Sequence, residues 1–260
     1  MTPPTGAAPG YVGPVDYTSL VESVRVEGQT LAVALEDAAA DDLVPTCEGW
    51  KVADLAVHVG EFCGFWSHVL CEATGRPKTP YPEPPGGDDV GLWVARLAGH
   101  LVEELDATPS GTEVWTWFDA DHTAGFVSRR CAHELAVHRY DAQSTSRTCT
   151  PIPSGLAEDG IDEVLDVLVT SRDRSGRGTG RTMALKGTDV GASWVVALEH
   201  DRIAVERGQL DGSTPTDTDV VVSGTASDLE LTLYRRPTLS PVDVHGDYTV
   251  LEEWHREFTF

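Results

Sequence analysis

The segment RRCAHELAVHRYD (residues 129–141) places several side chains that can bind metal on one expected helix. An α-helix turns by about 100° per residue, so Glu134 and His138, four positions apart, project from the same face one turn apart. His133 lies five positions before His138 and points away from it, which excludes the two-histidine face of the HExxH metalloprotease motif. The spacing indicates that Glu134 and His138 can hold one metal ion together.

The segment WKVADLAVHVG (residues 50–60) is the expected source of a third ligand. Its apolar residues recur at helical spacing, and His58 borders that apolar stripe. Antiparallel packing of the two helices would bring His58 beside Glu134 and His138, giving a two-histidine, one-carboxylate zinc set with an open fourth position, as in catalytic sites. The alternative is a hydrogen-bonded histidine at a helix boundary and a solvated glutamate, since short motifs often match by chance.

Length and charge limit the possible organisation and partners. A chain of 260 residues is expected to form two domains. With 19 Lys and Arg against 42 Asp and Glu, the formal net charge is -23, which repels phosphate backbones and anionic lipids, so nucleic acid is not an expected partner. The sequence shows no apolar run of about 20 residues and no export signal, so we expect a cytoplasmic protein without membrane contact.

The five cysteines are scattered and form no CxxC pair, so reduced thiols are expected rather than disulfides or a cysteine zinc site. Cys131, three residues before Glu134, could be a nucleophile, but a small buried residue is the preferred interpretation. Trp50 and Trp66 are interpreted as packing residues rather than a substrate-stacking wall.

Apolar periodicity divides the first half into a loose segment (residues 1–15) and an antiparallel four-helix bundle (residues 16–150). The helices are expected near residues 17–40, 50–73, 90–105 and 125–144, with a Pro-rich loop over residues 75–89.

A helix and a linker with a Ser/Gly/Arg hinge are expected over residues 151–180, where Asp162 and Glu163 are interpreted as a solvated face. Residues 181–260 are expected to form a small α+β domain. Its strands fall near residues 182–185, 194–198, 203–206 and 220–222, with helices at 227–234 and near Leu251. The predicted fold class is therefore α+β.

Four ordered blocks carry a family resemblance: GWKVADLAVH (49–58), RRCAHELAVHRYDA (129–142), LAEDGIDE (156–163), and GTASDL (224–229) with Gly246-Asp247. In these blocks the chain resembles the mycothiol-dependent maleylpyruvate isomerase family of actinobacteria. The family usually has Pro-Gly-Trp where this chain has Glu48-Gly49-Trp50, and commonly Trp at the position of Tyr140.

The resemblance implies a DinB-like bundle that binds zinc through His58, Glu134 and His138, and a sterol-carrier-like C-terminal domain. It also implies that the C-terminal domain supplies a catalytic arginine, for which Arg236 is the best match and its neighbour Arg235 the alternative. The implied cosubstrate is mycothiol, which would attack an electrophilic small molecule, so that the enzyme is a cis-trans isomerase or a thiol S-transferase.

The sequence is also compatible with two other functions. A zinc site with a free position could instead hydrolyse an amide or ester without a thiol, or the chain could be a non-catalytic small-molecule-binding protein. Either Arg236 or Arg139 could hold a substrate carboxylate through a bidentate pair. Asp141 could orient the imidazole of His138 or form a surface ion pair. A monomer or a homodimer is expected.

Overall fold

The structure, a computed structural model, describes residues 15–72, 75–76, 89–171, 178–210 and 217–258. It divides into two compact units, one formed by Met1–Leu43 with Gly49–Ala142 and the other by Val44–Glu48 with Gln143–Phe260. The predicted loose segment before residue 15, and most of the predicted Pro-rich loop and hinge, lie outside the described residues. Each unit has buried apolar side chains of its own.

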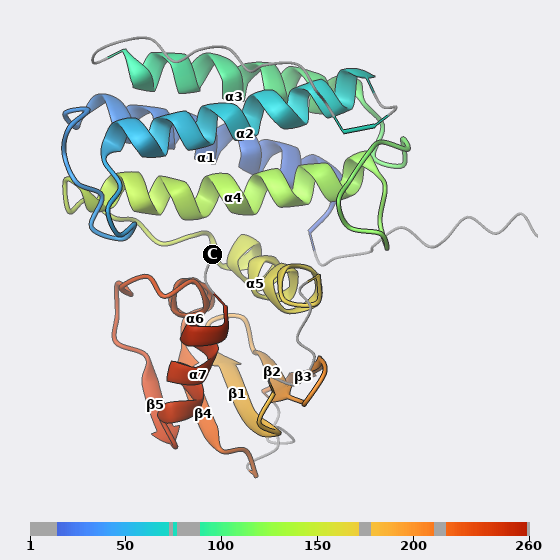
Figure 1. Cartoon of the computed structure of the whole chain (residues 1–260), viewed down its shortest axis with the longest axis vertical. Coiled ribbons are helices and arrows are strands. Elements are labelled where there is room, and N and C mark those ends of the chain that lie inside the picture. The colour runs from blue at the N-terminus through green and yellow to red at the C-terminus, as the bar shows by residue number, and fades with distance from the viewer. Residues whose placement is uncertain (1–14, 73–74, 77–88, 172–177, 211–216, 259–260) are drawn as a thin grey trace, which may run out of the picture. The chain divides into compact units, whose positions relative to one another are not determined.

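In the described part of the first unit, four helices are present and confirm the predicted bundle (Figure 1). Asp16 caps the first helix, since its side chain accepts a hydrogen bond from the backbone N–H of Ser19 at 3.0 Å. This helix ends at Glu36 rather than near residue 40, because the chain turns there and the Asp42 carboxylate accepts a hydrogen bond from the N–H of Ala39. The helices are α1 (Tyr17–Glu36), α2 (Val52–Glu72), α3 (Val90–Ala107) and α4 (Ala124–Ser144).

Helices α1 and α3 run antiparallel. The Tyr17 hydroxyl, at the start of α1, lies 2.8 Å from the carbonyl oxygen of Leu105 near the end of α3. At the other end of the pair, a Cβ atom on Gly91 would meet the side chain of Glu36 at 2.4 Å, so glycine permits the close approach of the two helices there.

Helices α2 and α3 run parallel. Gly60 on α2 faces Trp93 near the start of α3, and further along both helices burial and the neighbouring Glu104 carboxylate raise the pKa of the Cys71 thiol. Two parallel helices that follow each other in the sequence need a connection long enough to run back along the bundle. The stretch of chain between Glu72 and Val90 is long enough for this.

Replacing Gly60 by Ala should destabilise the bundle. The added Cβ would lie 2.0 Å from the ring of Trp93, which is only 4% exposed. Overpacking of this kind costs about 1–3 kcal/mol, and the better helix propensity of Ala offsets part of it, so a net loss of about 1–2 kcal/mol is expected in urea unfolding. Gly99→Ala is the matched control, because a Cβ there meets no atom within 4 Å and should stabilise the helix. Equal stability of the two variants would show that the Trp93 ring moves aside freely.

The second unit contains a five-stranded sheet of order β3-β2-β1-β4-β5. β1 pairs in parallel with β4, and the other neighbouring strands are antiparallel. The four predicted strands are confirmed, and the short edge strand β5, with the sequence DVHG, was not predicted because Asp and Gly disfavour strands. The strands are β1 (Arg181–Gly187), β2 (Ala192–Leu198), β3 (Ile203–Gln209), β4 (Val220–Gly224) and β5 (Asp243–Gly246).

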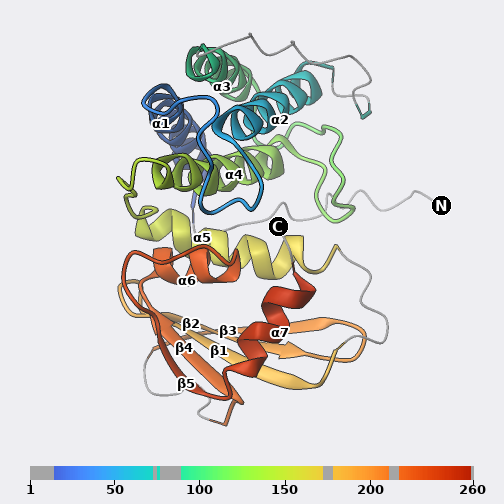
Figure 2. The ribbon, with the colours of Figure 1, turned by 60° about the vertical axis from the view of Figure 1, so that its left-hand side comes forward.

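Three helices accompany this sheet: α5 (Ser154–Glu163), which continues into a π-helical turn (Val164–Leu168), α6 (Ala226–Leu233) and α7 (Thr249–Glu257). Figure 2 shows α5 and α6 side by side, with α7 crossing the strands. The predicted solvated face of α5 is wrong, because Asp162 and Glu163 are both buried. Asp162 accepts hydrogen bonds from the indole of Trp194 and the guanidinium of Arg207, two strand residues that helical periodicity cannot reveal.

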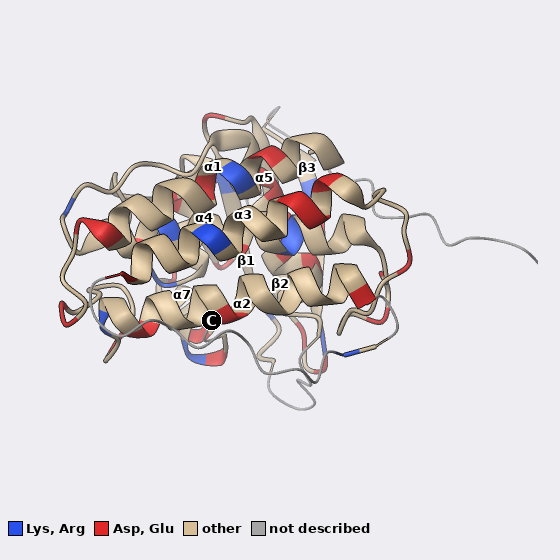
Figure 3. Cartoon of the chain, turned by 90° about the horizontal axis from the view of Figure 1, so that it is seen from above, with Lys and Arg blue, Asp and Glu red and all other residues tan. Residues whose placement is uncertain are grey.

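The acidic excess of the chain is not confined to one segment, since Figure 3 shows Asp and Glu on several helices and loops. Among the described residues, each helix is too short or too polar to span a bilayer.

Candidate metal centre

The predicted antiparallel packing of α2 and α4 is present. His58, in the first half of α2, contacts Glu134 at the middle of α4. Trp66, later in α2, contacts Phe126 near the start of α4, with ring centroids 6.4 Å apart. The two sequence segments singled out above therefore lie against each other within one unit of the protein.

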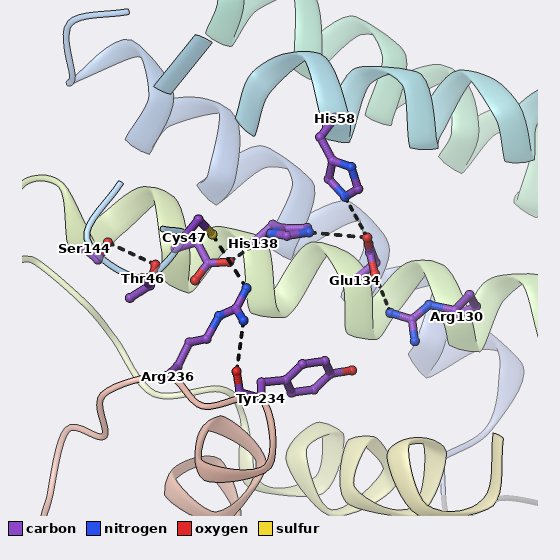
Figure 4. Close-up of polar contacts among 10 residues, drawn as sticks. Thr46, Cys47, His58, Arg130, Glu134, His138, Ser144, Tyr234 and Arg236 are labelled. Carbon is purple, nitrogen blue, oxygen red and sulfur yellow. Dashed lines mark hydrogen bonds and ion pairs between the residues drawn. The ribbon is translucent and has the colours of Figure 1, made fainter. Parts of the chain in front are cut away.

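The structure brings the three predicted ligands together (Figure 4). One oxygen of Glu134, Oε1, lies 3.0 Å from Nε2 of His58 and 3.3 Å from Nε2 of His138. The three ligand atoms all lie within 4.8 Å of one another, and the two imidazole centroids are 4.8 Å apart. The His58 side chain is 39% exposed, whereas those of Glu134 and His138 are 20% and 10% exposed, so one side of the cluster is open to solvent.

These atoms fit a zinc ion. Zinc binds imidazole nitrogen and carboxylate oxygen at about 2.0–2.2 Å, so two ligands of a tetrahedral ion are about 3.3 Å apart. The distances from Glu134 Oε1 to the nitrogens of His58 and His138, 3.0 and 3.3 Å, are close to that spacing. A second indication is the ionisation of the carboxylate that would bind the metal. Burial alone would raise the pKa of Glu134, but the Arg130 charge and the hydrogen bonds with His138 and His58 hold this pKa well below its usual value.

Asp141 fixes the orientation of the His138 ring. Its carboxylate is fully buried and lies 2.9 Å from Nδ1 of His138. Burial alone would lower the pKa of His138, but the hydrogen bonds to Asp141 and Glu134 outweigh it and raise this pKa to about 9. With Nδ1 held by Asp141, Nε2 is the nitrogen that faces Glu134 and would bind a metal. The predicted role of Asp141 in orienting an imidazole agrees with this geometry, and its alternative as a surface ion pair is wrong.

One further side chain of the site, that of Arg130, was not singled out from the sequence. Arg130 donates a hydrogen bond from Nη2 to Oε2 of Glu134 at 2.6 Å, and their i, i+4 spacing on α4 is a signal that could have revealed the pair. The ring of Trp50 makes an edge contact with the imidazole of His58, with centroids 5.2 Å apart. Trp50 thus packs against a proposed ligand, and Trp66, at 2% exposure, is a packing residue as predicted.

Arg139 cannot serve as a binder of substrate carboxylates. It is buried and donates a hydrogen bond to Glu27 on α1 at 2.7 Å, inside the bundle. The interpretation of Cys131 as a small buried residue is confirmed. Cys63, on α2, is also buried, and burial together with the Glu134 charge raises the pKa of its thiol to about 12. Neither thiol is therefore an accessible nucleophile.

Arg236 lies after α6 in the second unit and is half-buried. Its guanidinium donates hydrogen bonds to the carbonyl oxygen of Tyr234 at 2.9 Å and to Sγ of Cys47 at 3.6 Å. The neighbouring Arg235 is exposed and adopts a left-handed backbone conformation, with φ of 58°. Of the two, Arg236 is the more buried, and its guanidinium is held by these two hydrogen bonds.

Fold and site together define a class of α+β proteins in which a four-helix bundle carries a two-histidine, one-glutamate cluster and precedes a small mixed-sheet domain. The chain belongs to the mycothiol-dependent maleylpyruvate isomerase family. The family model described as the mycothiol maleylpyruvate isomerase N-terminal domain matches residues 21–143, and the model for the corresponding C-terminal domain matches residues 155–253.

Solved structures give the same fold. The crystal structure of the mycothiol-dependent maleylpyruvate isomerase covers 90% of this chain and 95% of its own, with a TM-score of 0.58 and 16% sequence identity. A variant of that isomerase matches over the same shares of both chains with a TM-score of 0.57 and 16% identity. A search of curated proteins found no match. At this level of identity the likeness confirms the predicted α+β fold class and says nothing of the reaction.

Proposed function

We propose that this protein is a zinc-dependent enzyme that activates mycothiol for attack on an electrophilic small molecule. The observation that carries the proposal is the cluster of His58, Glu134 and His138, whose three ligand atoms lie within 4.8 Å of one another. Three protein ligands leave zinc a free position, which is typical of catalytic rather than structural sites.

The side chains have distinct tasks in this proposal. The zinc ion would be held by His58, Glu134 and His138. The Asp141 carboxylate keeps the His138 ring oriented by accepting a hydrogen bond from its Nδ1. Bound zinc would favour the thiolate over the thiol and so supply a nucleophile at neutral pH. The buried thiols of Cys63 and Cys131 are unsuited to this role, and the proposal assigns the attacking sulfur to a cosubstrate. Membership of a mycothiol-dependent family supports mycothiol as that cosubstrate.

Two reactions follow from the same attack. If the thiolate adds to an activated double bond and leaves after rotation about the resulting single bond, the product is the cis-trans isomer. If the sulfur stays attached, the neighbouring carbon takes up a proton from solvent, the product is a thioether and the enzyme is an S-transferase. The family name favours the isomerase and does not fix the electrophile.

Arg236 is the proposed catalytic arginine. A guanidinium recognises a carboxylate through two parallel hydrogen bonds, which suits an electrophile of the maleylpyruvate type. The contacts with Tyr234 and Cys47 use Nη1 and Nη2 and hold the guanidinium in a defined position within its own unit.

The test is an assay of zinc-loaded protein with maleylpyruvate, and separately with other unsaturated electrophiles, in the presence and absence of mycothiol. Product analysis by mass spectrometry separates isomerisation, which leaves the mass of the electrophile unchanged, from transfer, which adds the mass of the thiol. Turnover only with mycothiol is expected. Equal turnover without the thiol would point to the hydrolase instead. Protein that neither binds zinc nor turns over any electrophile would point to the non-catalytic binding protein.

A further inference from the structure

Four polar residues follow one another along a single face of α4: Arg130, Glu134, His138 and Asp141. Their spacing places all four within about 80° of the helix circumference. Each contacts the next. Figure 4 shows the pairs Arg130–Glu134 and Glu134–His138, and the third pair is His138–Asp141. The two inner residues are the proposed metal ligands, so each ligand on this helix has one outer partner.

The two oxygens of Glu134 have different partners. Oε1 faces the imidazole nitrogens of His58 and His138 at 3.0 and 3.3 Å. Oε2 accepts the hydrogen bond from Arg130 at 2.6 Å, and the Arg130 side chain is only 5% exposed, so water screens this ion pair poorly. The carboxylate therefore presents one oxygen to the proposed metal and the other to a cation.

The different partners of the two Glu134 oxygens affect how many oxygens of this carboxylate can bind the metal. A carboxylate can bind a metal through one oxygen or through both, and the second oxygen would occupy the coordination position that the thiol needs. A guanidinium bound to Oε2 competes with the metal for that oxygen. We propose that Arg130 is a positioning residue that restricts Glu134 to one ligand oxygen and thereby keeps a position open on the metal. The inference rests on the proposed metal site and adds to it the residue that keeps a coordination position free for the thiol.

A purely structural role for Arg130 has to be distinguished from this one, because buried ion pairs also affect folding. The chain offers a control in Glu27, which accepts a hydrogen bond from Arg139 of the same helix at 2.7 Å, in a pair that is more deeply buried than Arg130 and Glu134. Glu27 lies on α1 and is not one of the proposed ligands. Glu27→Gln therefore weakens a buried Arg–Glu pair and leaves the proposed ligands in place.

The experiment replaces zinc by cobalt(II), whose visible absorption is strong in four-coordinate sites and weak at higher coordination numbers. Wild-type protein, Arg130→Gln and Glu27→Gln are each loaded with cobalt and then titrated with 2-mercaptoethanol as the probe thiol. We expect a four-coordinate spectrum and a sulfur-to-cobalt charge-transfer band for wild type and Glu27→Gln. Arg130→Gln should give a weaker spectrum and should need at least about 10-fold more thiol to develop the band, the lower end of the effect of outer partners on metal sites.

The outcomes separate the two proposals. If wild type binds no cobalt, the metal site fails, and this inference fails with it. If wild type binds cobalt and Arg130→Gln gives the same spectrum and the same thiol titration, the metal site stands and the role of Arg130 is overturned. Equal changes in Arg130→Gln and Glu27→Gln would also overturn it, because they would reflect a general loss of packing. Should Arg130→Gln not fold, a crystal structure of the zinc-loaded wild type decides: coordination by Oε1 alone supports the inference, and coordination by both oxygens of Glu134 contradicts it.

Discussion

Replacing His58 by Ala is expected to remove the bound metal and the thiol-dependent activity while leaving the protein folded. His58 is the one proposed ligand contributed by α2, and without it the ion keeps only two protein ligands. We expect a loss of metal affinity of at least about 100-fold, since even outer partners of ligands contribute about 10–100-fold. Catalytic efficiency should fall in parallel. The fold should survive, because the side chain is 39% exposed and a packed bundle does not depend on a metal as a zinc finger does.

Metal content after dialysis, circular dichroism and the mycothiol-dependent assay check this prediction. His100→Ala is the control, because its side chain is 52% exposed on α3 and belongs to neither the cluster nor its outer partners. It should keep the metal and the activity of wild type. Undiminished zinc in His58→Ala would refute the three-ligand site. An unfolded His58→Ala protein would mean that the site stabilises the structure rather than serving a reaction.

Replacing Asp141 by Ala should have the second-largest effect, a fall in metal affinity of about 10–100-fold. The carboxylate is fully buried and accepts the Nδ1 hydrogen bond that directs Nε2 of His138 towards Glu134. Ala removes both the negative charge and the acceptor, so the His138 ring is no longer held. Asn keeps an acceptor oxygen of similar shape, and Asp141→Asn should therefore lose less affinity than Asp141→Ala.

Competition with a chelator measures these affinities, and thermal unfolding of the metal-free proteins gives the accompanying cost in stability. We expect that cost to be about 1–3 kcal/mol for Asp141→Ala, the usual value for losing a buried hydrogen-bonding group. If both variants bound metal like wild type, orientation of His138 by Asp141 would be unimportant. If Asn were as weak as Ala, the charge rather than the hydrogen bond would matter.

Local periodicity was sufficient to predict the helices, the strands other than β5, and the relation between two of the three proposed ligands. The apolar stripe of α2 placed His58 at its border, and antiparallel packing of this helix against α4 was the condition for bringing it beside Glu134 and His138. The i, i+4 relation of Glu134 and His138 follows from helix geometry alone. These parts of the site depend on short-range patterns, which a single sequence displays directly.

Contacts between residues far apart in the sequence could not be read in this way. The burial of Arg139 depends on Glu27, 112 positions earlier in the chain. The burial of Asp162 depends on Trp194 and Arg207, which reach it from strands whose register no helical pattern encodes. In each case a charged residue that looks solvent-exposed on its own helix is paired by another element.

The concentration of Arg130, Glu134, His138 and Asp141 on α4 has a consequence for how such a site can change. A rigid shift of this helix would carry all four groups together as one body and leave their mutual distances unaltered. The remaining variable is the separation between α4 and the imidazole that α2 contributes. Larger or smaller side chains between these two helices, such as substitutions at the Trp66–Phe126 contact, would therefore change the distance between His58 and the two ligands on α4. They would do so without altering any group that binds the ion.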